Sequence, residues 1–188
     1  DLQWQYDYSS NNGAYVGEPK QAVGFTIDGY HSGDLKTTTV TAPDQSKTQH
    51  VFYRGWNYLE GTEVATRHFD VDGTSLLKTT TSAFSESAFL GTVEMRGINL
   101  ATLIKRALPA STTITTFVAA SPADRFITQY QNYNVYGAAQ QIIERNSIDP
   151  TVRTTTTSYQ NDIGHWLLNL ETNRQVQQET AYGAESVS

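Results

Sequence analysis

The chain has 188 residues, enough for one good-sized domain, and a net charge of −6 that argues against nucleic-acid partners and anionic membrane surfaces. It has no cysteine, which excludes disulfide frameworks, zinc ribbons and thiol redox enzymes. No apolar run approaches the roughly 20 residues of a membrane-spanning helix. Charged residues make up 17% of the chain, and the many Thr, Ser, Gln, Asn and Tyr residues are typical of exposed β-structure.

Strict alternation predicts a strand at the start of the chain. Trp4, Tyr6 and Tyr8 share one face of residues 2–8, and polar residues occupy the other. Because the sequence begins directly in this strand, we expect it to be part of a longer protein. Further strands are predicted at 22–30, 35–41 and 48–53.

The stretch Glu63 to Phe84 predicts a β-hairpin. Its first arm alternates, and its return arm is rich in Thr, which suits a half-exposed pleated surface. Between them, Asp70-Val71-Asp72-Gly73 supplies a turn, because Gly adopts a positive φ without strain and Asp bonds its own backbone.

Residues 85–124 are less regular and allow two interpretations. Apolar residues over 98–108 lie near helical spacing and could form a short amphipathic helix. The alternative is a strand at about 100–107, a turn at Pro109-Ala110-Ser111 and a strand at Thr112–Val118. The β-branched residues after the proline favour this hairpin.

The rest of the chain predicts more hairpins within a single domain of residues 1–180. Phe126–Tyr133 and Ala139–Arg145 flank a turn at Asn134-Val135-Tyr136-Gly137. Residues 181–188 are small and polar, and we expect a frayed C-terminal tail. The remaining expected elements are strands at 152–159 and 170–180 with a loop at 161–169.

Three sequence patterns recur along the chain. Phe69-Asp70-Val71-Asp72-Gly73 and Tyr133-Asn134-Val135-Tyr136-Gly137 both read aromatic-x-Val-x-Gly at a hairpin tip. A basic residue precedes a Thr run at Lys36, Lys78 and Arg153, and Trp56 and Trp166 each stand six residues before a Thr. Repeated hairpins of this kind cannot bury their own apolar faces, so neighbours must associate into a long sheet.

These patterns resemble the RHS/YD-repeat family, whose hallmark is an aromatic residue, often followed by Asp, shortly before a Gly at a hairpin turn. The matching residues are Phe69, Asp70 and Gly73 at the first tip and Tyr133, Asn134 and Gly137 at the second. The segments TTTVTAPDQSKTQHVFYRG and WLLNLET are similar to further family segments. Asn134 departs from the usual Asp, and no Arg-Leu follows either Gly.

The resemblance implies a mainly β fold: stacked antiparallel hairpins forming an extended, curved sheet that is part of a β-shell. It implies a non-catalytic segment of a secreted or bacterial cell-surface protein, whose shell encloses a toxin domain or presents an adhesive one. The implied partners are other repeats of the same longer chain, an enclosed toxin domain or a cell-surface glycan.

No catalytic, cofactor or metal site is indicated. The four histidines, His31, His50, His68 and His165, lack the spacing of a metal motif and are interpreted as packed or solvated side chains. Asp70-Val71-Asp72-Gly73 lacks the later ligands of a calcium loop. Glu60 and Glu63 are more simply explained as a charged sheet edge than as a glycosidase pair.

The aromatic residues support a rival hypothesis, a stand-alone glycan-binding β-module. Flat rings stack on sugar faces, and Trp56, Tyr58 and Trp166 in loops are the candidate contacts. Trp4, Tyr133 and Tyr136 are weaker candidates. For alternating aromatics such as Trp4, Tyr6 and Tyr8, the simpler explanation is that they cover the packed face of the sheet.

Overall fold

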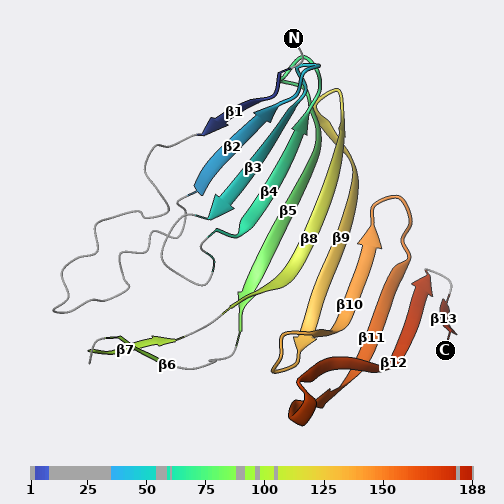
Figure 1. The fold of residues 1–188 in the computed structure, drawn as a ribbon. Helices are drawn as coiled ribbons and strands as arrows, with labels where there is room; N and C mark the ends of the chain where they lie inside the picture. The colour runs from blue at the N-terminus through green and yellow to red at the C-terminus, as the bar shows by residue number, and fades with distance from the viewer. Residues whose placement is uncertain are drawn as a thin grey trace.

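The structure, a computed structural model, describes residues 3–8, 35–53, 59, 61–87, 92–95, 98–103, 106–180 and 183–187 (Figure 1). The expected strand at 22–30 lies outside them. The strands are β1 Gln5–Tyr8, β2 Leu35–Thr41, β3 Lys47–Tyr53, β4 Glu63–Phe69, β5 Leu76–Glu86, β6 Thr92–Met95, β7 Ile98–Leu103, β8 Ala107–Val118, β9 Ser121–Tyr133, β10 Ala139–Asn146, β11 Val152–Asp162, β12 Leu167–Thr180 and β13 Gly183–Val187. One 3₁₀ turn, η1 Ile163–His165, precedes β12.

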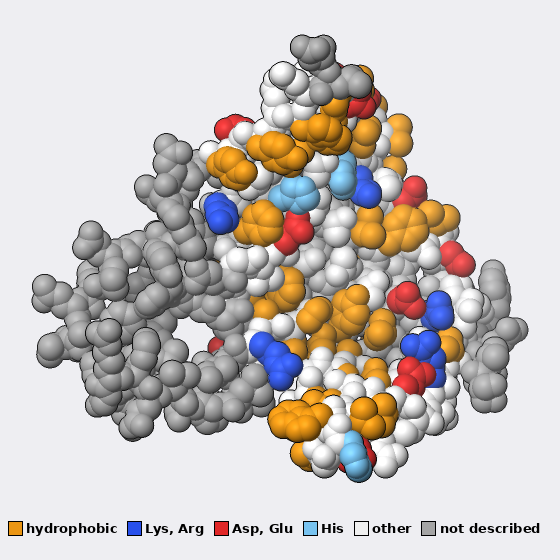
Figure 2. All heavy atoms as spheres, viewed as in Figure 1, with side chains coloured by type: hydrophobic (Ala, Val, Ile, Leu, Met, Phe, Trp, Pro, Cys, Tyr) orange, Lys and Arg blue, Asp and Glu red, His pale blue; other side chains and the backbone are white. Residues whose placement is uncertain are grey.

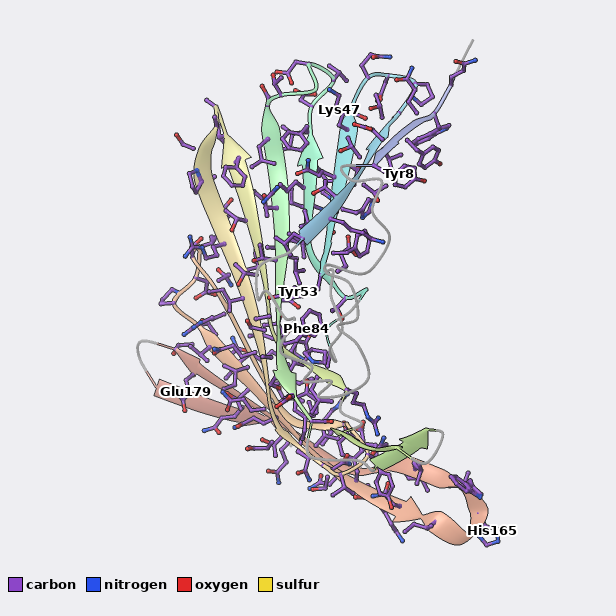
Figure 3. The ribbon with its side chains drawn as sticks, turned by 90° about the vertical axis from the view of Figure 1, so that its left-hand side faces the viewer. Tyr8, Lys47, Tyr53, Phe84, His165 and Glu179 are labelled. Atoms are coloured by element: carbon purple, nitrogen blue, oxygen red, sulfur yellow. The ribbon has the colours of Figure 1, made fainter. Side chains whose placement is uncertain are left out.

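Eleven of these strands form one antiparallel sheet in the order β1-β2-β3-β4-β5-β8-β9-β10-β11-β12-β13. Each strand pairs with its neighbours in sequence, apart from the step from β5 to β8. The separate two-stranded sheet β6–β7 interrupts that step. Where the chain leaves β5 and returns to β8, the Ser87 amide donates to the Arg106 carbonyl at 3.0 Å. This bond extends the hydrogen-bond ladder between β5 and β8. The predicted mainly β fold, an extended and curved antiparallel sheet, is confirmed, and Figure 3 shows the curvature from the side.

The hairpin predicted over Glu63 to Phe84 is present as β4 and β5. Its register pairs Ala65 with Thr81 and His68 with Lys78, and a bulge follows at Phe69. β5 extends two residues beyond the prediction, to Glu86, because β8 pairs with it from Lys78 to that residue.

The interpretation of residues 98–118 needs correction. Residues 98–103 are strand β7 and not a helix, but the turn predicted at Pro109-Ala110-Ser111 is wrong because β8 runs straight through it. Opposite Ala83 and Phe84, β8 has a bulge in which Ala110 is the extra residue, and a bulge is where a strand tolerates proline. The chain turns instead at Ala119-Ala120, whose φ angles are 49° and 64°.

The C-terminal hairpins are longer than predicted. The loop expected at 161–169 shortens to a tight turn, because β11 continues to Asp162 and β12 begins at Leu167. Residues 183–187, expected as part of a frayed tail, pair with Val176–Thr180 as β13. The short return segment satisfies backbone groups at that end of β12, which composition alone does not reveal.

The described strands bury few apolar side chains. Val51 and Ala65, opposite each other on β3 and β4, and Leu108 on β8 are the buried hydrophobic residues of the described part, at 3%, 8% and 8% exposure. Larger apolar side chains lie open on the sheet (Figure 2). They include Trp4, Tyr6 and Tyr8, at 60–63% exposure, so the expectation that these aromatics are packed is wrong for the described chain. Among the described elements, contacts join paired strands and the η1 turn to β12, and no second layer covers the faces of the main sheet.

Candidate functional site

The first predicted tip, after Phe69, is a self-contained turn. The Asp70 amide donates to the Ser75 carbonyl at 2.9 Å, and the Gly73 amide donates to the Asp70 carbonyl at 2.8 Å. Gly73 has a φ of 68°, as the turn prediction requires.

The Asp72 carboxylate is directed into that turn. Its Oδ1 accepts from the Thr74 and Ser75 amides at 2.8 and 2.7 Å, and the Ser75 hydroxyl donates to its Oδ2. The Ser75 hydroxyl, followed by the two backbone amides, lowers the pKa of Asp72 to about 2. The carboxylate therefore serves the turn, in keeping with the turn interpretation over the calcium one.

The second predicted tip, between β9 and β10, is connected to its neighbours. Asn134 Oδ1 accepts from the Tyr136 and Ala138 amides at 3.0 Å each, while Nδ2 donates to Asn169 Oδ1 on β12 at 2.9 Å. On the other side, the Tyr133 hydroxyl donates to the Pro109 carbonyl of β8, and burial is the main cause of the raised pKa of Tyr133.

Gly137 completes this tip. It has a φ of 82°, and a Cβ there would lie 3.1 Å from Nη1 of Arg106, which donates to the Tyr136 carbonyl. An asparagine side chain can donate where an aspartate cannot, so Asn134 connects its own hairpin to the one that contains Asn169. Sequence reasoning missed Asn169, which stands 35 residues away and carries no motif.

A third tip joins β11 and β12 through η1. Asp162 caps the turn: its Oδ1 accepts from the His165 amide at 3.2 Å, and its Oδ2 lies 2.8 Å from His165 Nδ1. Trp166 follows with φ 57° and ψ 25°, the left-handed conformation, and is 83% exposed. Figure 3 shows this tip, marked by His165, projecting from one end of the sheet, far from Tyr8 on β1.

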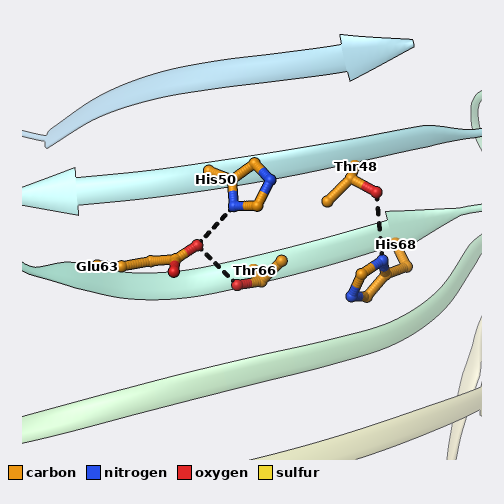
Figure 4. Close-up of polar contacts among 5 residues, drawn as sticks. All are labelled: Thr48, His50, Glu63, Thr66 and His68. Carbon is orange, nitrogen blue, oxygen red and sulfur yellow. Dashed lines mark hydrogen bonds and ion pairs between the residues drawn. The ribbon is translucent and has the colours of Figure 1, made fainter. Parts of the chain in front are cut away.

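Two histidines lie on β3 and β4, and one of them, His50, contacts a glutamate (Figure 4). His50 Nδ1 is 2.7 Å from Glu63 Oε1, which also accepts from the Thr66 hydroxyl at 2.8 Å. The ring of His50 stacks on Phe52 with centroids 6.3 Å apart. His68 Nδ1 is 3.3 Å from the Thr48 hydroxyl.

The side chains of His50, Glu63 and His68 are all partly exposed. Burial, then the charge of Lys78 and the neighbouring His50, lowers the pKa of His68. The side chains of His50 and Glu63 are 34% and 40% exposed on the open sheet. Glu60, the second carboxylate of the glycosidase alternative, lies outside the described residues, as does His31.

A shallow depression of about 310 Å³ lies elsewhere, over β9, β10 and β11. Glu144 and Arg153 form an ion pair across it at 3.7 Å, and both side chains are about half exposed. In the part of the chain that can be described, no three His, Asp or Glu side chains are grouped to hold a metal. No helix of the described segments has the length and apolarity to cross a membrane.

The aromatic candidates do not form a common platform in the described structure. Trp56 and Tyr58 lie outside the described residues, and Tyr133 and Tyr136 belong to the second tip. Among the described candidates, Trp166 alone stands at the third tip, which Figure 3 places far from Tyr8 on β1. Comparisons of the chain with protein-family models, with curated proteins and with solved structures give no match.

Proposed function

We propose that this chain is a non-catalytic segment of a β-shell wall of the RHS/YD-repeat type, in a secreted or cell-surface protein. The observation that carries the proposal is the curved antiparallel sheet of eleven strands, in which few apolar side chains of the described residues are buried. A sheet whose apolar side chains stay exposed gains stability when further chain covers them, as in a closed shell.

The two ends of the sheet support the same proposal. β1 pairs with β2 alone, and the segment Leu167–Gln175 of β12 pairs with β11 alone within the described strands. Unpaired backbone at a sheet edge is a template for another strand. In a shell, these edges would continue into neighbouring repeats of the longer chain, and the concave space would hold a toxin domain or support an adhesive one.

The glycan-binding alternative now depends mainly on Trp166. Of the three loop aromatics proposed as glycan contacts, it is the one that the structure describes, and its side chain is exposed. The polar groups beside it already bond one another, which leaves few partners for sugar hydroxyls. A non-catalytic wall therefore remains the better supported function.

Hydrogen exchange followed by mass spectrometry tests the wall. We expect amides in 3–8 and 167–175 to exchange rapidly in the isolated chain and to become protected in the longer parent protein. Peptide mapping of that parent should reveal further hairpin repeats. Edges that are already protected in a monomer of this chain, or a parent without additional repeats, would contradict the proposal.

A further inference from the structure

The tip between β11 and β12 directs apolar side chains outward. Ile163, Trp166, Leu167 and Leu170 are 64%, 83%, 50% and 43% exposed. Ile163 and Trp166 belong to one turn, since the Trp166 amide donates to the Ile163 carbonyl at 3.2 Å. We call these four residues the Trp166 tip. Several apolar residues clustered at one projecting end mark an interaction site more strongly than the same residues scattered singly.

The polar groups of the tip are hydrogen-bonded to one another, although the side chains of His165 and Asp162 are 79% and 45% exposed. Both carboxylate oxygens of Asp162 contact His165, and Asn161 Oδ1 accepts from the Asn169 amide at 2.8 Å. Asn169 also accepts the bond from Asn134, which braces the base of the tip against the neighbouring hairpin. A hydrogen-bonding ligand such as a sugar would have to displace these contacts, whereas an apolar phase would not.

The charged residues near the tip are two acids and one arginine, and His165 adds a positive charge only if it is protonated. Asp162 lies beside His165, and Glu171 Oε1 lies 3.4 Å from Arg174 Nε. The tip therefore has no excess positive charge to attract an anionic surface, and the whole chain carries −6. An uncharged apolar environment complements it best.

The backbone at Trp166 gives an independent reason to assign a role to its ring. A φ of 57° suits glycine, and a bulky side chain is a genuine outlier there. A turn needs no tryptophan at this position, so the exposed ring is kept at a conformational cost. Outliers of this kind point to functional positions.

We propose that the Trp166 tip is an interfacial anchor that places Trp166 and its flanking aliphatic side chains in the headgroup region of an electrically neutral phospholipid bilayer. Tryptophan prefers this boundary because its ring is apolar and its N–H can remain hydrated. A projecting tip enters a fluid bilayer without needing a preformed pocket, whereas a protein partner would need a cavity that matches it. The proposal is independent of the β-shell.

The test uses phosphatidylcholine vesicles and a Trp4→Phe/Trp56→Phe variant, in which Trp166 is the remaining tryptophan. We expect its fluorescence to shift to the blue on adding vesicles and to be quenched by lipids brominated on the acyl chains. Flotation of the unmodified chain with the same vesicles provides a second readout, in case the double variant does not fold. Trp166→Gly should weaken partitioning by at least about tenfold, because the ring supplies the largest apolar area.

Trp166→Gly also separates binding from folding. Because glycine fits the left-handed turn, the variant should unfold at the same temperature as the wild type or a higher one. The matched control is Trp4→Ser, at an exposed tryptophan on the first strand segment, which should leave partitioning unchanged. No flotation, equal binding of Trp166→Gly, dependence on anionic lipid, or Trp166-dependent binding to a glycan array without vesicle binding would each overturn the proposal.

Discussion

Replacing Asn134 tests whether the second hairpin tip holds neighbouring hairpins together. Asn134→Ala removes three hydrogen bonds: two from backbone amides within the tip and one to Asn169 on β12. At about 1 kcal/mol net for each bond, the expected loss is about 2–4 kcal/mol. For a chain of this size the melting temperature should fall by roughly 5–12 °C.

The matched control is the aspartate at the equivalent position of the first tip. Asp70 Oδ1 accepts one exposed hydrogen bond, from its neighbour Val71, and contacts no other hairpin in the described structure. Asp70→Ala should therefore unfold at the temperature of the wild type. Asn134→Asp keeps the acceptor for both backbone amides, and we expect it to lie closer to the wild type than to Asn134→Ala.

Thermal unfolding followed by far-ultraviolet circular dichroism measures all three variants. Hydrogen exchange locates the effect: in Asn134→Ala, amides around Asn169 should lose protection together with those of 134–138. The reasoning fails if Asn134→Ala and Asp70→Ala unfold at the same temperature, or if the loss of protection stays within the β9–β10 tip.

Three further predictions concern other parts of the sheet. Replacing Ala119-Ala120 with Asn-Gly should stabilise the chain by about 1–2 kcal/mol in urea unfolding, since both residues have positive φ and Asn-Gly favours such a turn; an unchanged midpoint would count against the turn geometry. Val51→Ala should cost about 1–2 kcal/mol, whereas Val118→Ala, at a residue that is 69% exposed, should cost almost nothing. The pKa of His68 in the folded chain lies below its ordinary value of 6.5, so on acidification the unfolded chain is protonated at His68 before the folded chain is. The folded state is therefore destabilised relative to the unfolded state as the pH falls below 6.5, and this loss is absent above that pH. His68→Gln should reduce the dependence of unfolding on pH between 7 and 5, and His165→Gln, at an exposed tip, is the comparison.

The strands and the glycine turns could be predicted from the sequence because their signals are local. The alternation of side chains along β4 predicts which residues share each face of that strand. The Asp-rich turn before Gly73 depends only on neighbouring residues. The same holds for the tip at Asn134, whose amide oxygen bonds backbone groups two and four residues ahead.

Other features depend on pairing between distant segments. Pro109 has the sequence signal of a turn residue, but pairing with β5 places it beside a bulge of β8 instead. Ala119-Ala120 contains no glycine or asparagine to indicate a positive φ. The bond from Asn134 to Asn169, and the outward direction of the Trp166 ring, likewise follow from how hairpins are placed beside one another.

The sequential order of the strands also bears on how the protein is made. In the main sheet every strand is laid against the one formed before it, and the detour between β5 and β8 starts and ends at neighbouring positions. Each new hairpin can therefore use the existing edge as its template, without waiting for any later part of the chain. Such a sheet can fold progressively from its N-terminal end as the polypeptide emerges from a ribosome, and its folding need not slow as more strands are added.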